Sequence, residues 1–170
     1  KIDYIDLWQM HAVETPEDAD IRFNKGVVDF MLEAREKGLV RYLGFTGHRN
    51  PSAHQRVLEL SNHSAVFDTC QLPVNLIDMS YHSFVRNVIP ILVDRDIGIL
   101  AMKSLADGRF FSIKEERERI VWESDEPIIP DYISIKEAIY SVLSLPVSVL
   151  ITGAENARLL NEKIELIKNF

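Results

Sequence analysis

The chain has 170 residues, of which 46% are hydrophobic, enough for one globular domain with a sizeable core. Its formal net charge of -7 at pH 7 argues against a nucleic-acid partner, and its apolar runs are too short to span a membrane. Cys70 is the single cysteine, which excludes an intrachain disulfide and a multi-cysteine zinc site and leads us to expect a cytoplasmic location.

Short apolar runs rich in β-branched residues recur along the chain and predict strands, with helical periodicity between them. The runs are "YIDLWQMH", "VRYLGFTG", "AVFDTCQLPVN", "GILAMK" and "VSVLITG". After the first run, Thr15–Asp18 predicts a helix cap with proline at the first helical position. A firmer helical pattern begins near Lys25 and ends at Gly38. The face predicted to be buried carries Val27, Phe30, Met31 and Ala34.

Two capping boxes predict the starts of later helices, at Ser52–Gln55 and at Ser134–Glu137. In each, the serine hydroxyl accepts the N–H of the third residue, whose side chain reaches back to the serine N–H. The helix after Ser134 ends before Pro146, which disfavours helical backbone in the preceding residue. Its apolar stripe is Ile135, Ala138, Ile139 and Val142, and that of the last helix is Ala157, Leu160, Ile164 and Ile167.

Uniformly apolar strands separated by helices predict parallel strands covered on both faces. The fold class is therefore α/β, either a barrel or a doubly wound sheet. Residues 106–133 break the pattern, because this stretch is charged and only weakly periodic. It is either a long loop on the active side or a surface insertion with a short helix. We expect residues 1–170 to form a single domain.

Polar residues follow the ends of the predicted strands, where working residues cluster in parallel α/β folds. His11 ends the first strand, either as a catalytic residue or as a histidine hydrogen-bonded at a strand terminus. The turn "ITGAEN" offers backbone N–H groups for phosphate, but the sequence has neither a Rossmann fingerprint nor a P-loop. Histidine spacing does not indicate a metal site. The other polar strand ends hold Thr46, Gly47, His48, Gln71, Asn75, Lys103, Ser104 and Thr152–Asn156.

In their order and spacing, these motifs resemble the aldo/keto reductase superfamily. "DYIDLWQMH" is similar to the family's fourth barrel strand, which ends in the active-site histidine, and "EKGLVRYLGFTGH" is similar to the fifth. "QLPVN", "GILAMKSLADG" and "VSVLITGAENARLLNEKIE" resemble the sixth, seventh and eighth strands. The resemblance implies a (β/α)8 TIM barrel, present here as an incomplete barrel of about five β/α units from its C-terminal part.

The resemblance implies an NAD(P)H-dependent oxidoreductase that reduces aldehydes or ketones to alcohols by hydride transfer, with NADPH expected and NADH as the alternative. His11 would orient the carbonyl of a small-molecule substrate and support the tyrosine acid. Thr46 and Gln71 would hold the nicotinamide carboxamide, and Met102 would lie against the nicotinamide face. The pyrophosphate would be lined by Lys103, Ser104 and Leu105, and the adenosine phosphate by Gly153, Ala154, Glu155 and Asn156.

The sequence departs from the family pattern in ways that affect the site. Gly47 stands where the family usually has asparagine, so one side chain for the carboxamide is missing. Leu159 and Lys163 replace residues that many members use around the adenine end. Lys163 would attract a 2′-phosphate, whereas Glu155 would repel one.

The family's proton-donating tyrosine, its aspartate and its lysine belong to the first three barrel units, and Tyr4, Tyr42 and Tyr81 do not match that tyrosine. We therefore expect the chain to be the C-terminal part of a reductase, lacking the acid of the active site. Unpaired strand edges would favour self-association. A non-catalytic nicotinamide-nucleotide sensor or regulatory subunit stays open as an alternative. Candidates for either substrate contact or packing are Phe110, Phe111 and Trp122.

Overall fold

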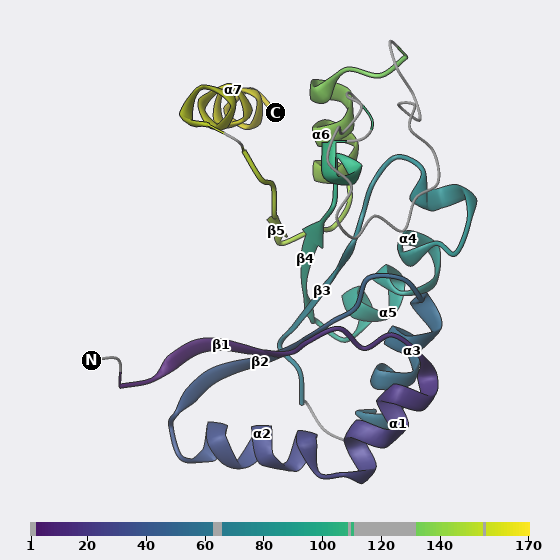
Figure 1. Cartoon of the computed structure of the whole chain (residues 1–170), viewed down its shortest axis with the longest axis vertical. Helices are drawn as coiled ribbons and strands as arrows, with labels where there is room; N and C mark the ends of the chain where they lie inside the picture. Colours follow the sequence, from purple (N-terminus) through teal and green to yellow (C-terminus); the bar gives the residue numbers. More distant parts are fainter. Residues whose placement is uncertain (1–2, 63–65, 109, 111–131, 155) are drawn as a thin grey trace.

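The computed structural model describes residues 3–62, 66–108, 110, 132–154 and 156–170. Its five strands form one parallel sheet in the order β1-β2-β3-β4-β5 (Figure 1). They are β1 (Ile5–Met10), β2 (Val40–Thr46), β3 (Thr69–Pro73), β4 (Gly98–Met102) and β5 (Val149–Leu150). Each lies in a run predicted to be a strand, so the α/β class is confirmed. The spatial order of the strands is the same as their order in the sequence, with no reversal. They are therefore consecutive strands of an incomplete barrel rather than strands of a doubly wound sheet.

Helices follow the strands and return the chain to the amino-terminal side of the sheet. In Figure 1, α1, α2, α3 and α5 lie together on one side of the strands. The helices are α1 (Pro16–Asn24), α2 (Val27–Glu36), α3 (Pro51–Leu60), α4 (Phe84–Asn87), α5 (Ile89–Asp94), α6 (Ile135–Leu143) and α7 (Ala157–Lys168), with 3₁₀ turns η1 (Asp78–Ser80) and η2 (Ala106–Gly108). Residues 111–131 of the predicted loop or insertion, with Phe111 and Trp122, lie outside the described residues.

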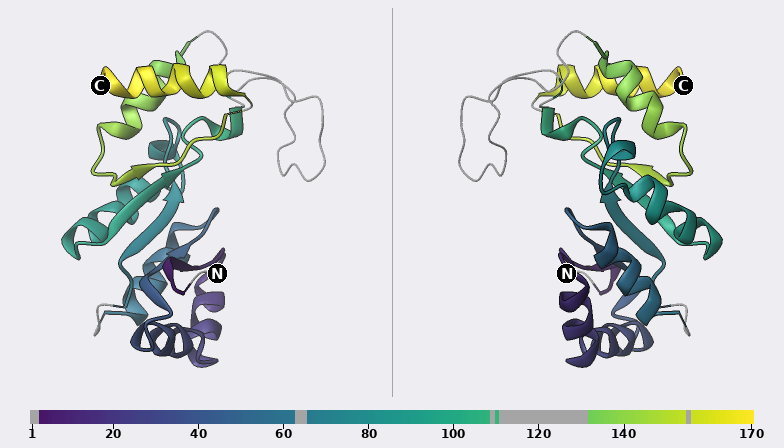
Figure 2. Two further views of the ribbon diagram at one scale, coloured as in Figure 1. Left: turned by 90° about the vertical axis from the view of Figure 1, so that its left-hand side faces the viewer. Right: turned by 90° about the vertical axis from the view of Figure 1, so that its right-hand side faces the viewer.

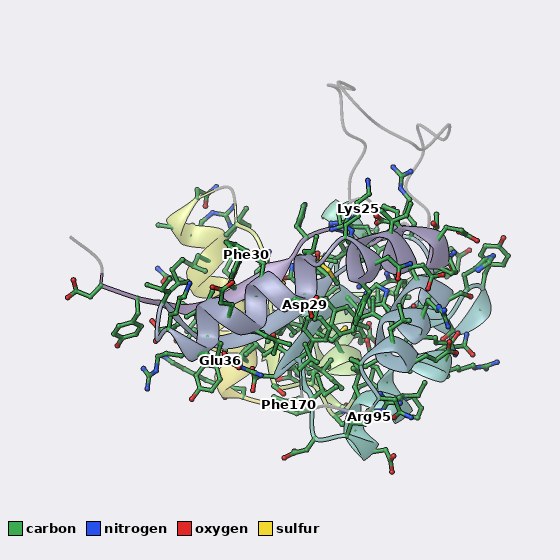
Figure 3. All side chains as sticks on the ribbon, turned by 90° about the horizontal axis from the view of Figure 1, so that it is seen from below. Lys25, Asp29, Phe30, Glu36, Arg95 and Phe170 are labelled. Carbon is green, nitrogen blue, oxygen red and sulfur yellow. The ribbon has the colours of Figure 1, made fainter. Side chains whose placement is uncertain are left out.

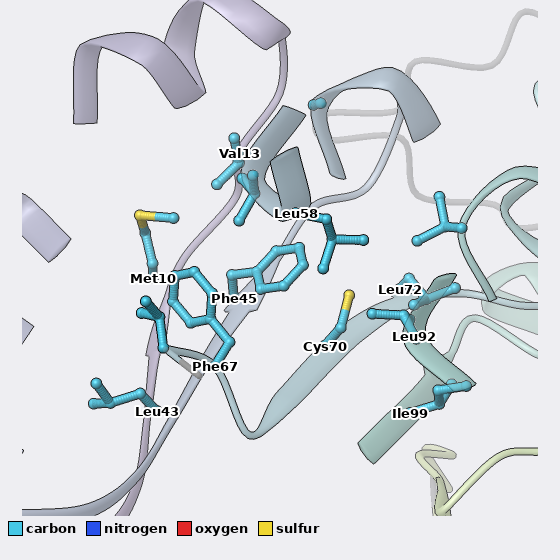
Figure 4. Close-up of a cluster of buried hydrophobic side chains, with 14 of the residues drawn as sticks. Met10, Val13, Leu43, Phe45, Leu58, Phe67, Cys70, Leu72, Leu92 and Ile99 are labelled. Atoms are coloured by element: carbon cyan, nitrogen blue, oxygen red, sulfur yellow. The ribbon is translucent and has the colours of Figure 1, made fainter. Parts of the chain in front are cut away.

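The hydrophobic core lies between these helices and one face of the sheet (Figure 4). Met10, Phe45 and Leu72 project into it from three neighbouring strands and are almost fully buried. The ring of Phe45 packs on that of Phe67, with 5.0 Å between the ring centroids. Cys70 is buried in the same layer, and burial raises the pKa of its thiol, so it behaves as a small apolar side chain.

The opposite face of the sheet is only partly covered in the described part of the chain, so the prediction of cover on both faces is wrong at its exposed positions. Ile5, Tyr42 and Val149 alternate with the core residues of their strands and are roughly half exposed. In a closed barrel, the strands on the far side fill this interior. Five strands do not close, and the helix of each unit returns on the outer side only.

The buried face of α2 differs from the prediction by part of a turn. Val27 and Phe30 are exposed, Phe30 at 63%. The ring of Phe30, which is labelled on α2 in Figure 3, packs edge-on against Trp8 with 5.9 Å between the ring centroids. Gly38 follows the helix in the left-handed region at φ 71°, as its predicted role as a helix stop requires. The face that is buried carries Val28, Met31 and Ala34.

Helix caps were partly predictable from sequence. As predicted, Thr15 caps α1 and Ser134–Glu137 forms a capping box before α6. The box predicted at Ser52–Gln55 is wrong, because α3 already begins at Pro51 and Asn50 is its cap. The Asn50 side chain accepts the N–H of the second helical residue at 3.0 Å. An Asn-Pro pair is itself a strong start signal, and it outweighs the box that follows it.

The apolar stripe predicted for α7 is not buried in the described structure. Leu160, Ile164 and Ile167 are exposed, and none of the residues described in α7 is buried. Figures 1 and 2 show α7 beyond the β5 edge of the sheet at the top of the molecule, with α1 and α2 at the opposite end, at the bottom. Its described support comes from α6, where the Tyr140 hydroxyl donates to the carbonyl of Leu166 at 3.0 Å. The stripe of α6 is confirmed at Ala138, Ile139 and Val142, whereas Ile135 is exposed.

A buried carboxylate organises the segment between β3 and α4. Asp78 is 9% exposed and accepts from the Ser83 hydroxyl at 2.8 Å and from the N–H groups of Phe84 and Val85 at 3.0 and 2.9 Å. Asp78→Ala should lower the free energy of unfolding by about 2 kcal/mol, because three donors lose a charged acceptor. Urea denaturation measures this, with exposed Asp94→Ala as the control expected within about 0.5 kcal/mol of the parent. An Asp78→Ala midpoint equal to that of the parent would contradict the assignment.

Candidate functional site

The carboxyl-terminal ends of the strands meet along one edge of the sheet, where barrel enzymes build their active sites. All the described residues predicted for the site lie along this edge. We call the edge the rim, defined by residues 11–14, 46–48, 71–75, 102–105, 152–154 and 156.

A line of polar contacts crosses the inner face just below the rim. Gln9 donates from Nε2 to Oε1 of Gln71 at 3.0 Å, and Gln71 donates from Nε2 to the sulfur of Met102 at 3.3 Å. Gln71 and Met102, predicted separately as cofactor contacts, are therefore in direct contact. Gln9 is absent from the predicted set. The sequence feature that points to Gln9 is its place as a polar residue inside an apolar strand. It lies two positions before His11 and therefore on the same face of the strand.

Thr46 links the end of β2 to the turn after β1. It is 2% exposed, and its Oγ1 accepts the N–H of Ala12 at 2.9 Å and lies 3.4 Å from Nδ1 of His11. Its carbonyl accepts the N–H of Val13 at 2.7 Å. The His11 side chain is exposed at the rim, and its contact with Thr46 is compatible with both predicted roles, the catalytic one and that of a histidine hydrogen-bonded at a strand terminus.

His48 stands beside His11, with 5.8 Å between the ring centroids and the planes at 74°. Partial burial lowers the pKa of His48, and the nearby Lys103 ammonium lowers it further, against the opposing effect of Glu14. Its Nδ1 is buried without a hydrogen-bond partner among the described residues. Burial and the Lys103 charge both favour the neutral form of the His48 ring. The sequence placed His48 at a strand end without giving it a role.

Another histidine lies underneath the rim. His54 of α3 is 0% exposed and packs between Phe45 and Phe84, with ring centroids 5.4 and 4.9 Å away. Burial lowers the pKa of His54 to about 4, although the Asn50 carbonyl, 3.4 Å from Nδ1, acts in the opposite direction. Gly47 lies against this ring, and a Cβ placed there would come within 2.5 Å of Cε1 of His54.

The chain turns sharply as it leaves β4. Lys103 and Ala106 have φ of 56° and 47°, and the N–H of Ala106 donates to the Lys103 carbonyl at 2.9 Å. Left-handed backbone is uncommon for residues with side chains, and it recurs at functional turns. The Lys103 side chain is exposed, whereas Ser104 is buried and Leu105 half-buried.

The turn between β5 and α7 carries the residues predicted around the adenosine phosphate. Asn156 caps α7, its side chain accepting the N–H of the third helical residue at 3.0 Å. Lys163 reaches back from α7 and donates to Oγ1 of Thr152 at 3.2 Å and to the carbonyl of Gly153. This contact brings a positive charge to the turn. Glu155 lies outside the described residues.

The structure thus brings the predicted residues of β1 to β4 into contact or near-contact, and the β5 turn follows along the same rim. The hydrogen bonding between β4 and β5 continues beyond the end of β5, because Ile151 donates its N–H to the Ala101 carbonyl at 2.8 Å. Within the described ranges, three or more His, Cys, Asp or Glu side chains do not gather as a metal site would require. None of the helices described is long and apolar enough to cross a membrane.

This arrangement of strands and rim residues agrees with the comparison with protein families. The model of the aldo/keto reductase family matches residues 1–165. The chain belongs to the aldo/keto reductase family.

Solved structures of aldo/keto reductases share the fold. The holo form of aldo-keto reductase AKR11C1 from Bacillus halodurans matches with a TM-score of 0.67 and 16% identity, over 98% of this chain and 56% of that one. The apo form of the same enzyme gives a TM-score of 0.63 and 14% identity, over 98% and 57%. This chain therefore spans little more than half the length of these structures. Comparison with curated proteins gave no significant match.

Family membership confirms the resemblance drawn from the five motifs and the incomplete barrel that it implied. The individual assignments of His11, Thr46 and Gln71 within the aldo/keto reductase site stay predictions, as does the assignment of the β5 turn. The structure adds Gln9 and His48 to the polar groups of that site.

Proposed function

We propose that this chain carries the dinucleotide-binding and carbonyl-orienting part of an NADPH-dependent aldo/keto reductase that reduces aldehydes or ketones to alcohols. The observation that carries the proposal is the convergence of different polar groups at one rim: the imidazole of His11, the carboxamide of Gln71 and the ammonium of Lys103 on it, and the carboxamide of Gln9 just below it. In a family of hydride-transfer enzymes, such a rim is suited to hold a nicotinamide next to a carbonyl.

The rim has unused hydrogen-bonding groups of the kind a nicotinamide needs. Oε1 of Gln9 and Nδ1 of His48 are buried, and neither has a partner within the described residues. Buried polar atoms are normally paired, so a ligand or water is expected to complete them. We assign the nicotinamide carboxamide to Gln71 and Thr46, beside Gln9, and the face of the ring to Met102.

The phosphate end is assigned to the exposed ammonium of Lys103 and to the turn before α7. A helix N-terminus favours anions, and Lys163 adds a positive charge at Gly153, which supports phosphate binding at this turn. The choice of NADPH over NADH rests on the family resemblance. Residues assigned to the pyrophosphate are Lys103, Ser104 and Leu105, and those assigned to the adenosine phosphate are Gly153, Ala154, Glu155 and Asn156.

In this proposal the bound dinucleotide supplies the hydride, and the chain supplies position and hydrogen bonds. His11, held next to Thr46, orients the substrate carbonyl. Tyr42 lies in the amino-terminal half of β2, away from the rim, and so does not provide the proton donor that carbonyl reduction needs. We therefore expect the 170-residue chain to bind NADPH without reducing a carbonyl.

Titration of the chain with NADPH and with NADH, followed by protein and nicotinamide fluorescence, tests the proposal. Lys103→Met should raise the NADPH dissociation constant about tenfold, because a charged hydrogen bond to phosphate is lost. Lys37→Met is the matched control, since Lys37 is an exposed lysine at the end of α2 and far from the rim.

Saturable NADPH binding that Lys103→Met weakens and Lys37→Met leaves unchanged supports the assignment. Equal affinities for all three proteins, or no binding at all by a folded chain, would contradict it.

A further inference from the structure

The turn that presents His11 has a backbone conformation that needs outside support. Ala12 adopts φ 50°, in the left-handed region that residues with a Cβ rarely occupy. Such a conformation costs about 1–3 kcal/mol and persists only where neighbouring groups fix it. The direction of the His11 side chain depends on this turn.

Two residues from different elements hold the turn. Thr46 of β2 binds its N–H groups, as described above. Arg22 of α1 binds its carbonyls: Nη1 donates to the carbonyl of His11 at 2.8 Å, and Nη2 donates to the carbonyl of Ala12 at 3.1 Å. A planar guanidinium is suited to this task, because its donors are fixed relative to one another and bind two acceptors at once.

Asp18 sets the position of that guanidinium. Its Oδ1 accepts from Nε of Arg22 and its Oδ2 from Nη2, both at 2.9 Å. Oδ2 also accepts the N–H of Glu14 at 3.2 Å, so the carboxylate binds the same loop from its other end. An isolated pair four residues apart on a helix surface would be worth little. Here the pair is joined to the loop by three further hydrogen bonds.

We propose that Arg22 and Asp18 are positioning residues for His11. Together they clamp the backbone of residues 11–14 against α1, while Thr46 clamps it against β2. The value of this clamp for catalysis rests on the role proposed for His11. The clamp itself is a property of the unliganded chain and is measurable without cofactor.

Residue-resolved NMR of the chain tests the clamp. Arg22→Met should speed hydrogen exchange at the amides of Ala12 and Val13 about tenfold or more, because hydrogen bonds to a charged group are lost. It should also shift the ring ¹⁵N resonances of His11. Arg22→Lys keeps the positive charge but loses the planar guanidinium. Its amide exchange rates and its His11 ring ¹⁵N resonances should therefore lie between those of the parent and those of Arg22→Met.

Arg56→Met is the matched control. Arg56 of α3 forms a comparable two-nitrogen pair with Asp20 of α1, at 2.9 and 2.7 Å, but belongs to no contact with residues 11–14 among the bonds described. This variant should leave the Ala12 exchange rate and the His11 ring unchanged even if it lowers the global stability. Should Arg22→Met fail to fold, Arg22→Lys and Arg56→Lys make the same comparison.

Parent-like exchange and ring resonances in the Arg22 variants, or equal changes in the Arg56 variants, would overturn the proposal. NADPH titration of the same proteins distinguishes the failure of the clamp from the failure of the proposed function. A clamp effect without NADPH binding keeps the positioning role and removes the proposed function, whereas binding without a clamp effect does the reverse.

Discussion

Gly47→Asn, which introduces the asparagine that the sequence resemblance leads one to expect at this position, should destabilise the protein by about 3 kcal/mol. A Cβ at position 47 would lie 2.5 Å from Cε1 of His54 and 2.5 Å from the carbonyl oxygen of Val13. Neither neighbour yields easily, because His54 is fully buried between aromatic rings and Val13 is tied to Thr46 by its N–H. The buried histidine thus occupies the space that a side chain at position 47 would need.

Urea denaturation measures the loss, and Gly153→Ala is the control. No heavy atom lies within 4 Å of a Cβ at position 153, so this change should alter stability by less than about 1 kcal/mol. The double variant Gly47→Ala with His54→Ala should lose less stability than the sum of the two single variants. The His54→Ala change removes the ring that the new Cβ would meet and leaves only the contact with the Val13 carbonyl oxygen. A Gly47→Asn protein as stable as the parent would show that the 46–48 turn is free to move away from α3.

Acidification from pH 7 to pH 4 should remove about 3 kcal/mol of stability through His54 alone. The pKa of this histidine falls from 6.5 to about 4 in the folded chain, chiefly because burial disfavours the charged ring. Between these values the unfolded state binds the proton more readily, so stability is complete above pH 6.5 and declines as the pH falls towards 4. Each unit of pKa difference corresponds to about 1.4 kcal/mol.

Urea denaturation at a series of pH values, for the parent and for His54→Gln, isolates this contribution. Other groups, including His48 and the carboxylates, titrate in both proteins and cancel in the difference. The glutamine variant should be less stable at pH 7 but should lose less stability on acidification. Parallel curves for the two proteins would mean that His54 is protonated, or reached by water, in the folded state.

The strands of the barrel were predicted well from the sequence, because each strand is a local apolar run bounded by turn residues. The same local logic found the Thr15 cap and the Ser134 capping box. It failed where two local signals competed, as at Asn50, whose pairing with proline begins α3 ahead of the predicted box. It also failed for α7 and for the inner face of the sheet, since periodicity shows that a face is apolar but not what covers it.

The site was predictable to the extent that position along a strand implies position at the rim. His11, Gln71 and Met102 lie there for that reason. The contacts of Gln9 and Arg22 depend on which elements pack together, at separations of 62 and 11 residues, and spacing alone does not reveal them.

Titrating NADPH into the ¹⁵N-labelled chain and mapping the amides that shift tests whether the rim is a nicotinamide dinucleotide site. We predict saturable changes concentrated at residues 11–13, 46–48, 71–72, 102–105 and 152–154. A folded chain that shows no changes would contradict the claim. So would changes confined to the pocket between α6 and α7, whose lining includes Tyr140 and Glu165.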